Sequence, residues 1–264
     1  MIRRTISEVK NGWQAALLIL WRQFSEPYRK TVLGFFWALA LPMVPIAAYV
    51  TLRLAIKDSS WDNNGVQPAV YVAVGVTLWL WLKDLFMAPI ASIQRQGVLI
   101  TQTRFHSILA ILIGAGHCIL ELLLRTAICI PLLMIFAEFS VENTFLAFGF
   151  IATSSLICIS AGMLVIPIWV VIPDILQALN VVFRFLIFFS LAIFPLSLPG
   201  KWNLFISANP FAYFIEGFRS ASFGDVSSIS WEHIGVTAGI GSLLFLIGLY
   251  IVGAMDERLK EVLV

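Results

Sequence analysis

Charged residues are scarce in this sequence. Only 12% of its 264 residues are Asp, Glu, Lys or Arg, whereas soluble globular domains carry about a quarter. Hydrophobic residues make up 60% of the chain. This balance excludes an ordinary soluble domain and predicts an all-α, polytopic integral membrane protein. A chain of this length has room for about six spanning helices of roughly 20 residues but not for a further soluble catalytic domain, so the energy source is expected on another chain.

Residues that bind metals or act as nucleophiles are also few and scattered. They are three cysteines inside apolar runs and three widely separated histidines: Cys118, Cys129, Cys158, His106, His117 and His233. An odd number of cysteines so placed gives neither a disulfide framework nor metal-ligand spacing, so we interpret them as packing residues. The phosphate-binding pattern GxxxxGK[ST] is absent from the sequence. We therefore expect no catalytic residue, no metal site and no cofactor bound by this chain, and a membrane-embedded enzyme is the least favoured function.

Residues 1–26 show a helical periodicity. Apolar side chains recur every three or four positions, at Ile2, Ile6, Val9, Trp13, Leu17, Leu20 and Phe24. Basic and polar residues lie between them, which is typical of an amphipathic helix in the plane of the membrane interface. Pro27 is expected to end this helix, because the residue before a proline avoids helical backbone angles. The first long apolar run begins only after Lys30, so we expect no cleaved signal peptide and a retained N-terminus.

Six apolar segments are predicted to span the membrane as one transmembrane domain. They are residues 31–52, 66–93, 107–136, 144–172, 176–198 and 234–255. Pro42 and Pro45 predict a kink in the first of them. Residues 94–106 form a predicted cytosolic loop, and residues 199–232 form a predicted outer segment. The apolar part of that segment, 210–215, is too short to span and is expected to be a helix or a re-entrant element at the outer interface.

The distribution of Lys and Arg predicts the orientation of the chain. Ten of them lie in the segments on the side of the termini, and four lie on the other side. The ten are Arg3, Arg4, Lys10, Arg22, Arg29, Lys30, Arg95, Arg104, Arg258 and Lys260, and the four are Arg53, Lys57, Lys201 and Arg219. The positive-inside rule therefore predicts that both termini are cytosolic.

Charged residues also occur within the predicted spans or at their ends. They are Lys83, Asp84, Glu121, Arg125, Asp174 and Arg184. Each costs about 2.5 to 3.5 kcal/mol at a helix centre unless it is paired or hydrated. Glu121 and Arg125 are four residues apart on one helical face and are expected to neutralise each other, either to lock helix packing or to line a polar conduit. Lys83 and Asp84 are adjacent and point in different directions, so we expect them to pair poorly and to lie near the cytosolic interface or a wet cavity.

Aromatic residues are frequent along the spans. They include Trp37, Tyr49, Tyr71 and Trp81. Two roles are open for them: an interfacial belt with ordinary helix packing, or a path along which sugar rings stack. The GxxxG pattern of Gly235 and Gly239 is likewise either a chance pattern or a site of close helix contact.

Three blocks of residues, spread over nearly the whole chain, carry a family resemblance. They are Tyr28, Arg29, Thr31, Leu33, Gly34, Trp37, Ala38 and Pro42; Gly97, Val98, Leu99, Ile100 and Phe105; and Asp174, Phe194, Pro195, Asn209, Pro210, Glu216 and Arg219. In their order and spacing the chain resembles the ABC-2 type permeases that export capsular polysaccharide, O-antigen or teichoic acid from bacteria. Two positions depart from the pattern: His106 stands where relatives commonly have proline, and Pro173 where an arginine is usual.

This resemblance implies a set of partners and a location. Two copies of the chain surround a central path in the bacterial inner membrane, and two copies of a separate ATPase subunit bind ATP and Mg²⁺. The implied substrate is a polysaccharide or glycolipid, with membrane lipids and periplasmic export partners as further contacts and no nucleic acid. The outer segment after the fifth span is implied to form part of the exit gate.

The resemblance also implies roles for individual residues. Those implied to couple to the ATPase are Trp13, Phe24, Arg95, Gln96, Leu99, Ile100, Arg104 and Phe105. Those implied to line the substrate path or gate are Tyr28, Arg29, Lys30, Trp37, Tyr49, Tyr71, Trp81, Lys83, Asp84 and Phe194. Tyr28 to Lys30 are expected to form a hinge between the interfacial helix and the first span.

Two other functions stay open on the sequence. One is an ABC-2 exporter of drugs or lipids. The other is an autonomous channel or ion-coupled secondary transporter that uses Lys83, Asp84, Glu121 and Arg125 for ion coupling.

Overall fold

The computed structural model describes residues 2–29, 32–34, 36–55, 68–103, 105–136, 141–193, 209–223 and 231–263. Every regular element in these ranges is a helix. The helices are α1 (Ile2–Arg29), α2 (Phe36–Ala55), α3 (Pro68–Arg95), α4 (Gly97–Gln102), α5 (Ser107–Phe136), α6 (Val141–Val171), α7 (Ile175–Leu186), the 3₁₀ helix η1 (Ile187–Phe189), α9 (Pro210–Phe223) and α10 (Trp231–Leu263).

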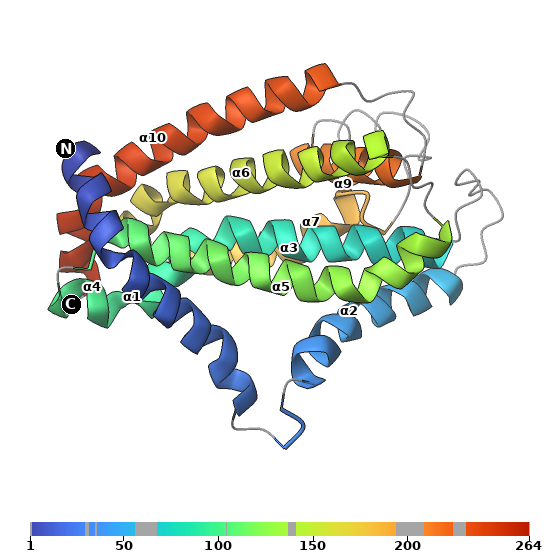
Figure 1. The fold of residues 1–264 in the computed structure, drawn as a ribbon, viewed down its shortest axis with the longest axis horizontal. Helices are drawn as coiled ribbons and strands as arrows, with labels where there is room; N and C mark the ends of the chain where they lie inside the picture. Colours follow the sequence, from blue (N-terminus) through green and yellow to red (C-terminus); the bar gives the residue numbers. More distant parts are fainter. Residues whose placement is uncertain are drawn as a thin grey trace.

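The long helices form a bundle in which α3 is central (Figure 1). Helix α3 packs against α2, α5, α6 and α9, and α10 packs along α6. Both termini and α4 lie at one end of the bundle, and α9 lies toward the other end. Helix α1 packs on α5 and then diverges from the bundle, so that α1 and α2 form a V. We call the end with the termini the terminal end; the sequence predicts that it is cytosolic.

Four helices in the described ranges are long and apolar enough to cross a membrane. They cover Val70–Arg95, Ser107–Thr126, Phe145–Val171 and Ile234–Leu263. Two shorter apolar helices cover Met43–Leu52 and Ile175–Phe189. The chain is thus a multi-pass membrane protein by composition and helix length, while the six spans predicted from the sequence stay a prediction for the two shorter segments.

The fifth predicted span, 176–198, is not one continuous helix. Helix α7 and η1 end at Phe189, and a turn follows in which Leu191 has a φ of 59°. A bulky residue rarely adopts this left-handed conformation, so the turn needs contacts from elsewhere to hold it. Residues 194–198 lie outside the described residues.

The prediction that Pro27 ends the first helix is wrong. Helix α1 continues through Pro27 to Arg29. Pro27 has no N–H to donate to the carbonyl four residues earlier, so the helix loses a single backbone hydrogen bond there. The two residues after it still keep helical geometry. The chain instead turns at residues 32–34, where Gly34 has a φ of 51°, and α2 begins at Phe36 rather than at residue 31. Tyr28 and Arg29 of the expected hinge still belong to α1, Lys30 lies outside the described residues, and the hinge stays a prediction.

Other predicted elements gain length in the structure. The expected short outer element, 210–215, is part of α9, which continues to Phe223 and packs on α6 and α3. The predicted charged tail after residue 255 continues α10 to Leu263. Helix α2 runs unbroken through Pro42 and Pro45, and the kink expected there stays a prediction.

Helices α3 and α6 cross in close contact at Gly162. A Cβ atom added there would lie 2.1 Å from the backbone carbonyl oxygen of Phe86, so only glycine fits. By contrast, Cβ atoms added at Gly235 and Gly239 would meet no atom within 4 Å. The GxxxG pattern is therefore not a helix contact within the described part of this chain, and α10 meets α6 at Gly241 and Gly248 instead.

We predict opposite effects for two matched Gly→Ala substitutions. Gly162→Ala forces α3 and α6 apart and lowers the free energy of unfolding by about 2 kcal/mol or more. Gly239→Ala meets open space and raises it by up to about 1 kcal/mol, because alanine is the better helix former. Thermal unfolding of both variants in detergent measures the difference; equal stabilities would contradict the described α3–α6 crossing.

Candidate functional site

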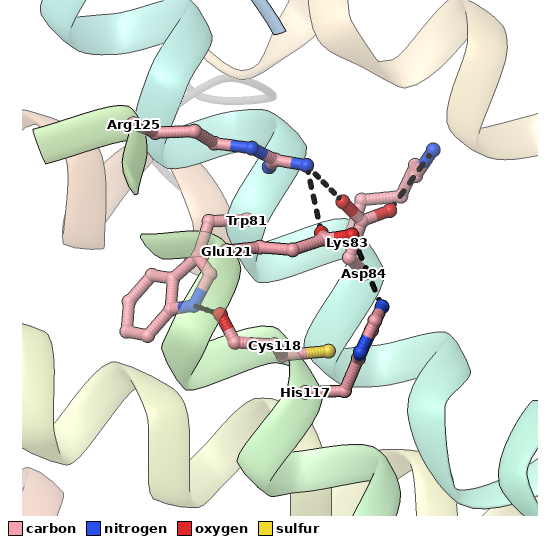
Figure 2. A network of polar contacts seen from close by, with 7 residues as sticks. All are labelled: Trp81, Lys83, Asp84, His117, Cys118, Glu121 and Arg125. Atoms are coloured by element: carbon pink, nitrogen blue, oxygen red, sulfur yellow. Dashed lines mark hydrogen bonds and ion pairs between the residues drawn. The ribbon is translucent and has the colours of Figure 1, made fainter. Parts of the chain in front are cut away.

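Helices α3 and α5 are joined by an ion network in the bundle (Figure 2). Nη2 of Arg125, on α5, donates to Oδ2 of Asp84 on α3 at 2.9 Å and to Oε2 of Glu121 at 3.0 Å. The predicted Glu121–Arg125 pair is confirmed, and Asp84 joins it from the neighbouring helix. One guanidinium thus bonds two carboxylates that come from different helices of an apolar bundle.

Two further groups extend this network. Nζ of Lys83 lies 3.3 Å from Oδ1 of Asp84, and Nε2 of His117 lies 3.3 Å from Oε1 of Glu121. The expectation that Lys83 and Asp84 pair poorly is therefore wrong: the lysine side chain is long and flexible enough to bend back to its neighbour. We call these five residues the α3–α5 ion network.

A neutral hydrogen bond reinforces the same helix pair. Nε1 of Trp81 donates to the backbone carbonyl of Cys118 at 3.2 Å (Figure 2). The Trp81 side chain is buried, so this bond satisfies the one polar atom of its indole. Trp81 is thereby engaged in helix packing.

The ion network is not fully satisfied. Nε and Nη1 of Arg125 and Nδ1 of His117 are buried and have no hydrogen-bond partner in the described structure. A buried polar atom without a partner costs about 1–3 kcal/mol. The network therefore stabilises the α3–α5 contact less than a network in which every buried donor had a partner.

A second polar cluster surrounds Arg219 of α9, which is 1% exposed. Its Nη1 donates to the carbonyl of Leu191 at 2.6 Å, and its Nη2 donates to the carbonyls of Tyr71 and Ala192 at 2.7 and 2.8 Å. These bonds give the buried carbonyls of Leu191 and Ala192 a hydrogen-bond donor and brace the turn in which Leu191 is left-handed. Arg219 thereby braces the turn that follows the end of η1.

The Arg219 cluster also joins α9 to α3. The guanidinium carbon lies 3.5 Å from the ring centroid of Tyr71, whose hydroxyl donates to Oε2 of Glu216 at 3.0 Å. A Cβ atom added at Gly75 would lie 1.8 Å from Nη2 of Arg219. The count of Lys and Arg places Arg219 among the outer charges and does not predict this role; the signal for it is an arginine that stands among the many apolar residues of 211–221.

The terminal end has a third cluster, which ties α5 to α10. Oδ1 of Asp256 accepts hydrogen bonds from N and Oγ of Ser107, at 3.0 and 2.6 Å. Asp256 also lies 3.0 Å from Nζ of Lys260 and 3.6 Å from Nδ1 of His106. The carboxylate occupies the N-terminus of α5, where backbone N–H groups favour an anion. The end of α10 thereby braces the loop between α3 and α5.

The residues expected to couple to an ATPase fall into exposed and buried sets. Trp13 and Arg95 are exposed, Leu99 and Phe105 are half-buried, and Arg104 lies outside the described residues. The side chains of Phe24, Gln96 and Ile100 are buried. The sequence did not predict that the 94–106 loop contains a helix, α4, whose most exposed apolar side chain is Val98 at 65%.

The residues expected to line a path do not converge on one site. Trp37 and Arg29 are exposed, Tyr49 is half-buried, and Tyr71 and Trp81 are buried in the contacts given above. The side chain of Tyr28, together with Lys30 and Phe194, lies outside what the structure describes. Asp174 and Arg184 are exposed on the segment of α7. Within the described residues, no group of three or more His, Cys, Asp or Glu is placed to hold a metal ion.

Comparison with known families gives one match. The family described as "ABC-2 type transporter" matches residues 14–223, which include all three blocks of the sequence resemblance and both the α3–α5 ion network and the Arg219 cluster. No curated protein sequence matches the chain.

We predict that Arg125→Ala destabilises the protein because it leaves Asp84 and Glu121 without their shared cation. Asp84 and Glu121 are half-buried and keep Lys83 and His117 as further partners, so we expect a loss of about 1–3 kcal/mol. Thermal unfolding in detergent measures it. Adding Glu121→Gln to Arg125→Ala removes one unpaired charge and should restore part of the stability. If the double variant is no more stable than Arg125→Ala alone, the network does not act as a packing device.

We predict that Arg219→Lys lowers the free energy of unfolding by about 3 kcal/mol, because an ammonium cannot reproduce the planar set of donors to the carbonyls of residues 71, 191 and 192. Arg184→Lys is the matched control, since Arg184 is exposed. Urea or thermal unfolding of the two variants should separate them. Similar stabilities would show that the 190–193 turn holds without Arg219.

Proposed function

Because this chain belongs to the ABC-2 type transporter family, we propose that it is the permease subunit of an ATP-driven exporter of lipid-linked or long-chain polysaccharide, of capsule or O-antigen type, across the bacterial inner membrane. The family match covers residues 14–223 and supports the transport class. The polysaccharide substrate rests on the resemblance carried by the residues around 28–42, 97–105 and 209–219. ATP and Mg²⁺ bind to the partner ATPase in this proposal, not to this chain.

The proposal of an ATPase partner is supported by the helices and exposed side chains at the terminal end. Helix α4, the start of α1 and the end of α10 gather there (Figure 1). Arg95 and Val98 are exposed at this end. On its other side α4 packs against the end of α10, where Leu263 lies next to Gly97. A short, braced helix with an exposed apolar tip is a suitable docking element for a second subunit.

The burial of Tyr71 and Trp81 supports a path between two copies of the chain rather than inside one. Both residues are engaged in helix packing, so neither is available to a substrate within a single copy. A path between copies would instead use exposed residues such as Trp37, Arg184 and Phe185. The second copy of the chain is thus part of the proposal.

The competing functions have distinct outcomes in one experiment. The chain is reconstituted in proteoliposomes with and without its ATPase partner, and transport is measured with ATP or with an ion gradient. ATP-dependent export of a lipid-linked glycan supports the proposal. Export of lipids or drugs but not of glycans favours the second ABC-2 function, and transport by the chain alone under an ion gradient would overturn the exporter.

We predict that Val98→Glu lowers the amount of ATPase subunit that copurifies with the chain at least tenfold, because it places a charge in the apolar tip of α4. A tenfold loss corresponds to about 1.4 kcal/mol of binding free energy. The chain should still insert and purify in normal yield. Pro210→Glu is the control, since Pro210 is exposed at the first turn of α9, toward the other end of the bundle, where a carboxylate is tolerated. Undiminished copurification with Val98→Glu would exclude α4 as the docking element.

A further inference from the structure

Helix α1 contacts the α3–α5 ion network through one pair of rings. The ring of Phe24 lies edge-on to the imidazole of His117, with the centroids 5.9 Å apart and the planes at 71°. Phe24 is buried, although the sequence places it on the face expected to lie in the interface. Nε2 of the same imidazole lies 3.3 Å from Oε1 of Glu121 (Figure 2). His117 thus joins α1 to the network.

A stripe of residues keeps α1 docked along the first half of α5. Gly12, Ala16, Leu20 and Phe24 follow one another at intervals of four. Ala16 packs in a buried cluster with Leu109 and Ile113 of α5. Gly12 faces Leu109, and Leu20 faces Gly116, both closely enough that an added Cβ would clash. Because the two helices are closely packed along this contact, a displacement of α1 also displaces the part of α5 that ends at His117.

Within the described residues, the network beyond His117 has hydrogen-bond donors that are not used. Arg125 already shares Nη2 between Glu121 and Asp84, while its Nε and Nη1 lack partners. A shift of α5 against α3 that brings an acceptor to either atom would satisfy a buried donor that has no partner in the described residues. A partly satisfied network between two helices is a suitable two-state element, because small shifts exchange one set of bonds for another.

We propose that His117 is a positioning residue that transmits displacement of α1 to the Glu121–Arg125–Asp84 bridge between α3 and α5. The imidazole pairs with the Glu121 carboxylate and also contacts the Phe24 ring. Movement of α1 thereby changes the position of Glu121 and the partners of Arg125. The source of that movement, an ATPase at the terminal end, rests on the proposed function; the contact itself does not.

The first test uses the chain alone. Phe24→Ala and Glu121→Gln are made singly and together, and thermal unfolding is measured in nanodiscs. The effects should be non-additive by about 2 °C or more, because both residues act through His117. In a His117→Leu background the same two substitutions should add. Additive effects in the native background, or equal coupling without the imidazole, would overturn the proposal.

The second test uses the complete complex with its ATPase, reconstituted in proteoliposomes of bacterial phospholipid. The amount of substrate exported per ATP hydrolysed should fall about threefold or more in His117→Leu. His117→Gln keeps an N–H donor toward Glu121 and should recover most of the loss, which a purely structural role would not require. Leu123→Ala, at an exposed position on α5, is the control.

The two tests separate two kinds of failure. If His117→Leu exports as much substrate per ATP hydrolysed as the native complex does, His117 does not transmit the movement, even though the complex exports its substrate. Absence of ATP-dependent export in the native complex would overturn the proposed function, and the chain-alone measurement would still decide whether His117 links α1 to the ion network.

Discussion

Two arginines, Arg125 half-buried and Arg219 buried, tie helix α3 to its neighbours. Arg125 holds the Asp84 region of α3 to α5, and Arg219 holds the Tyr71 region to α9 and the 190–193 turn. These positions on α3 are about 20 Å apart along the helix axis at 1.5 Å per residue. Helix α3 is also the most buried of the four long apolar helices, with 72% of its apolar window buried. Its polar groups must therefore find hydrogen-bond partners on neighbouring helices, and α5 and α9 supply them through Arg125 and Arg219.

Features that depend on local periodicity could be predicted from the sequence, and features that depend on contacts between helices could not. The range 107–136 and the pairing of Glu121 with Arg125 follow from hydrophobicity and a spacing of four. The addition of Asp84 to that pair could not be predicted, because it depends on the rotation of α3 against α5. The interruption of the fifth span had no local signal either, since the turn is held by a side chain 28 residues away from Leu191.

The three polar clusters divide the bundle into regions with different roles. The Asp256 cluster fixes the start of α5 and braces the loop that contains α4. The α3–α5 ion network lies beside the end of the contact between α1 and α5. The Arg219 cluster fixes α9 toward the opposite end. In the proposed exporter, ATPase movements enter at α4 and α1, pass through the ion network, and act on a path between two copies of the chain.

The central claim is that α1 moves α5 through Phe24 and His117. It is tested most directly by pulsed EPR on spin labels at two exposed positions, Leu123 on α5 and Leu243 on α10, in the complex with the ATPase. If Phe24 and His117 transmit the movement, ATP changes the distance between these labels in the native chain and leaves it constant in Phe24→Ala. The same ATP-dependent change in both chains would contradict it.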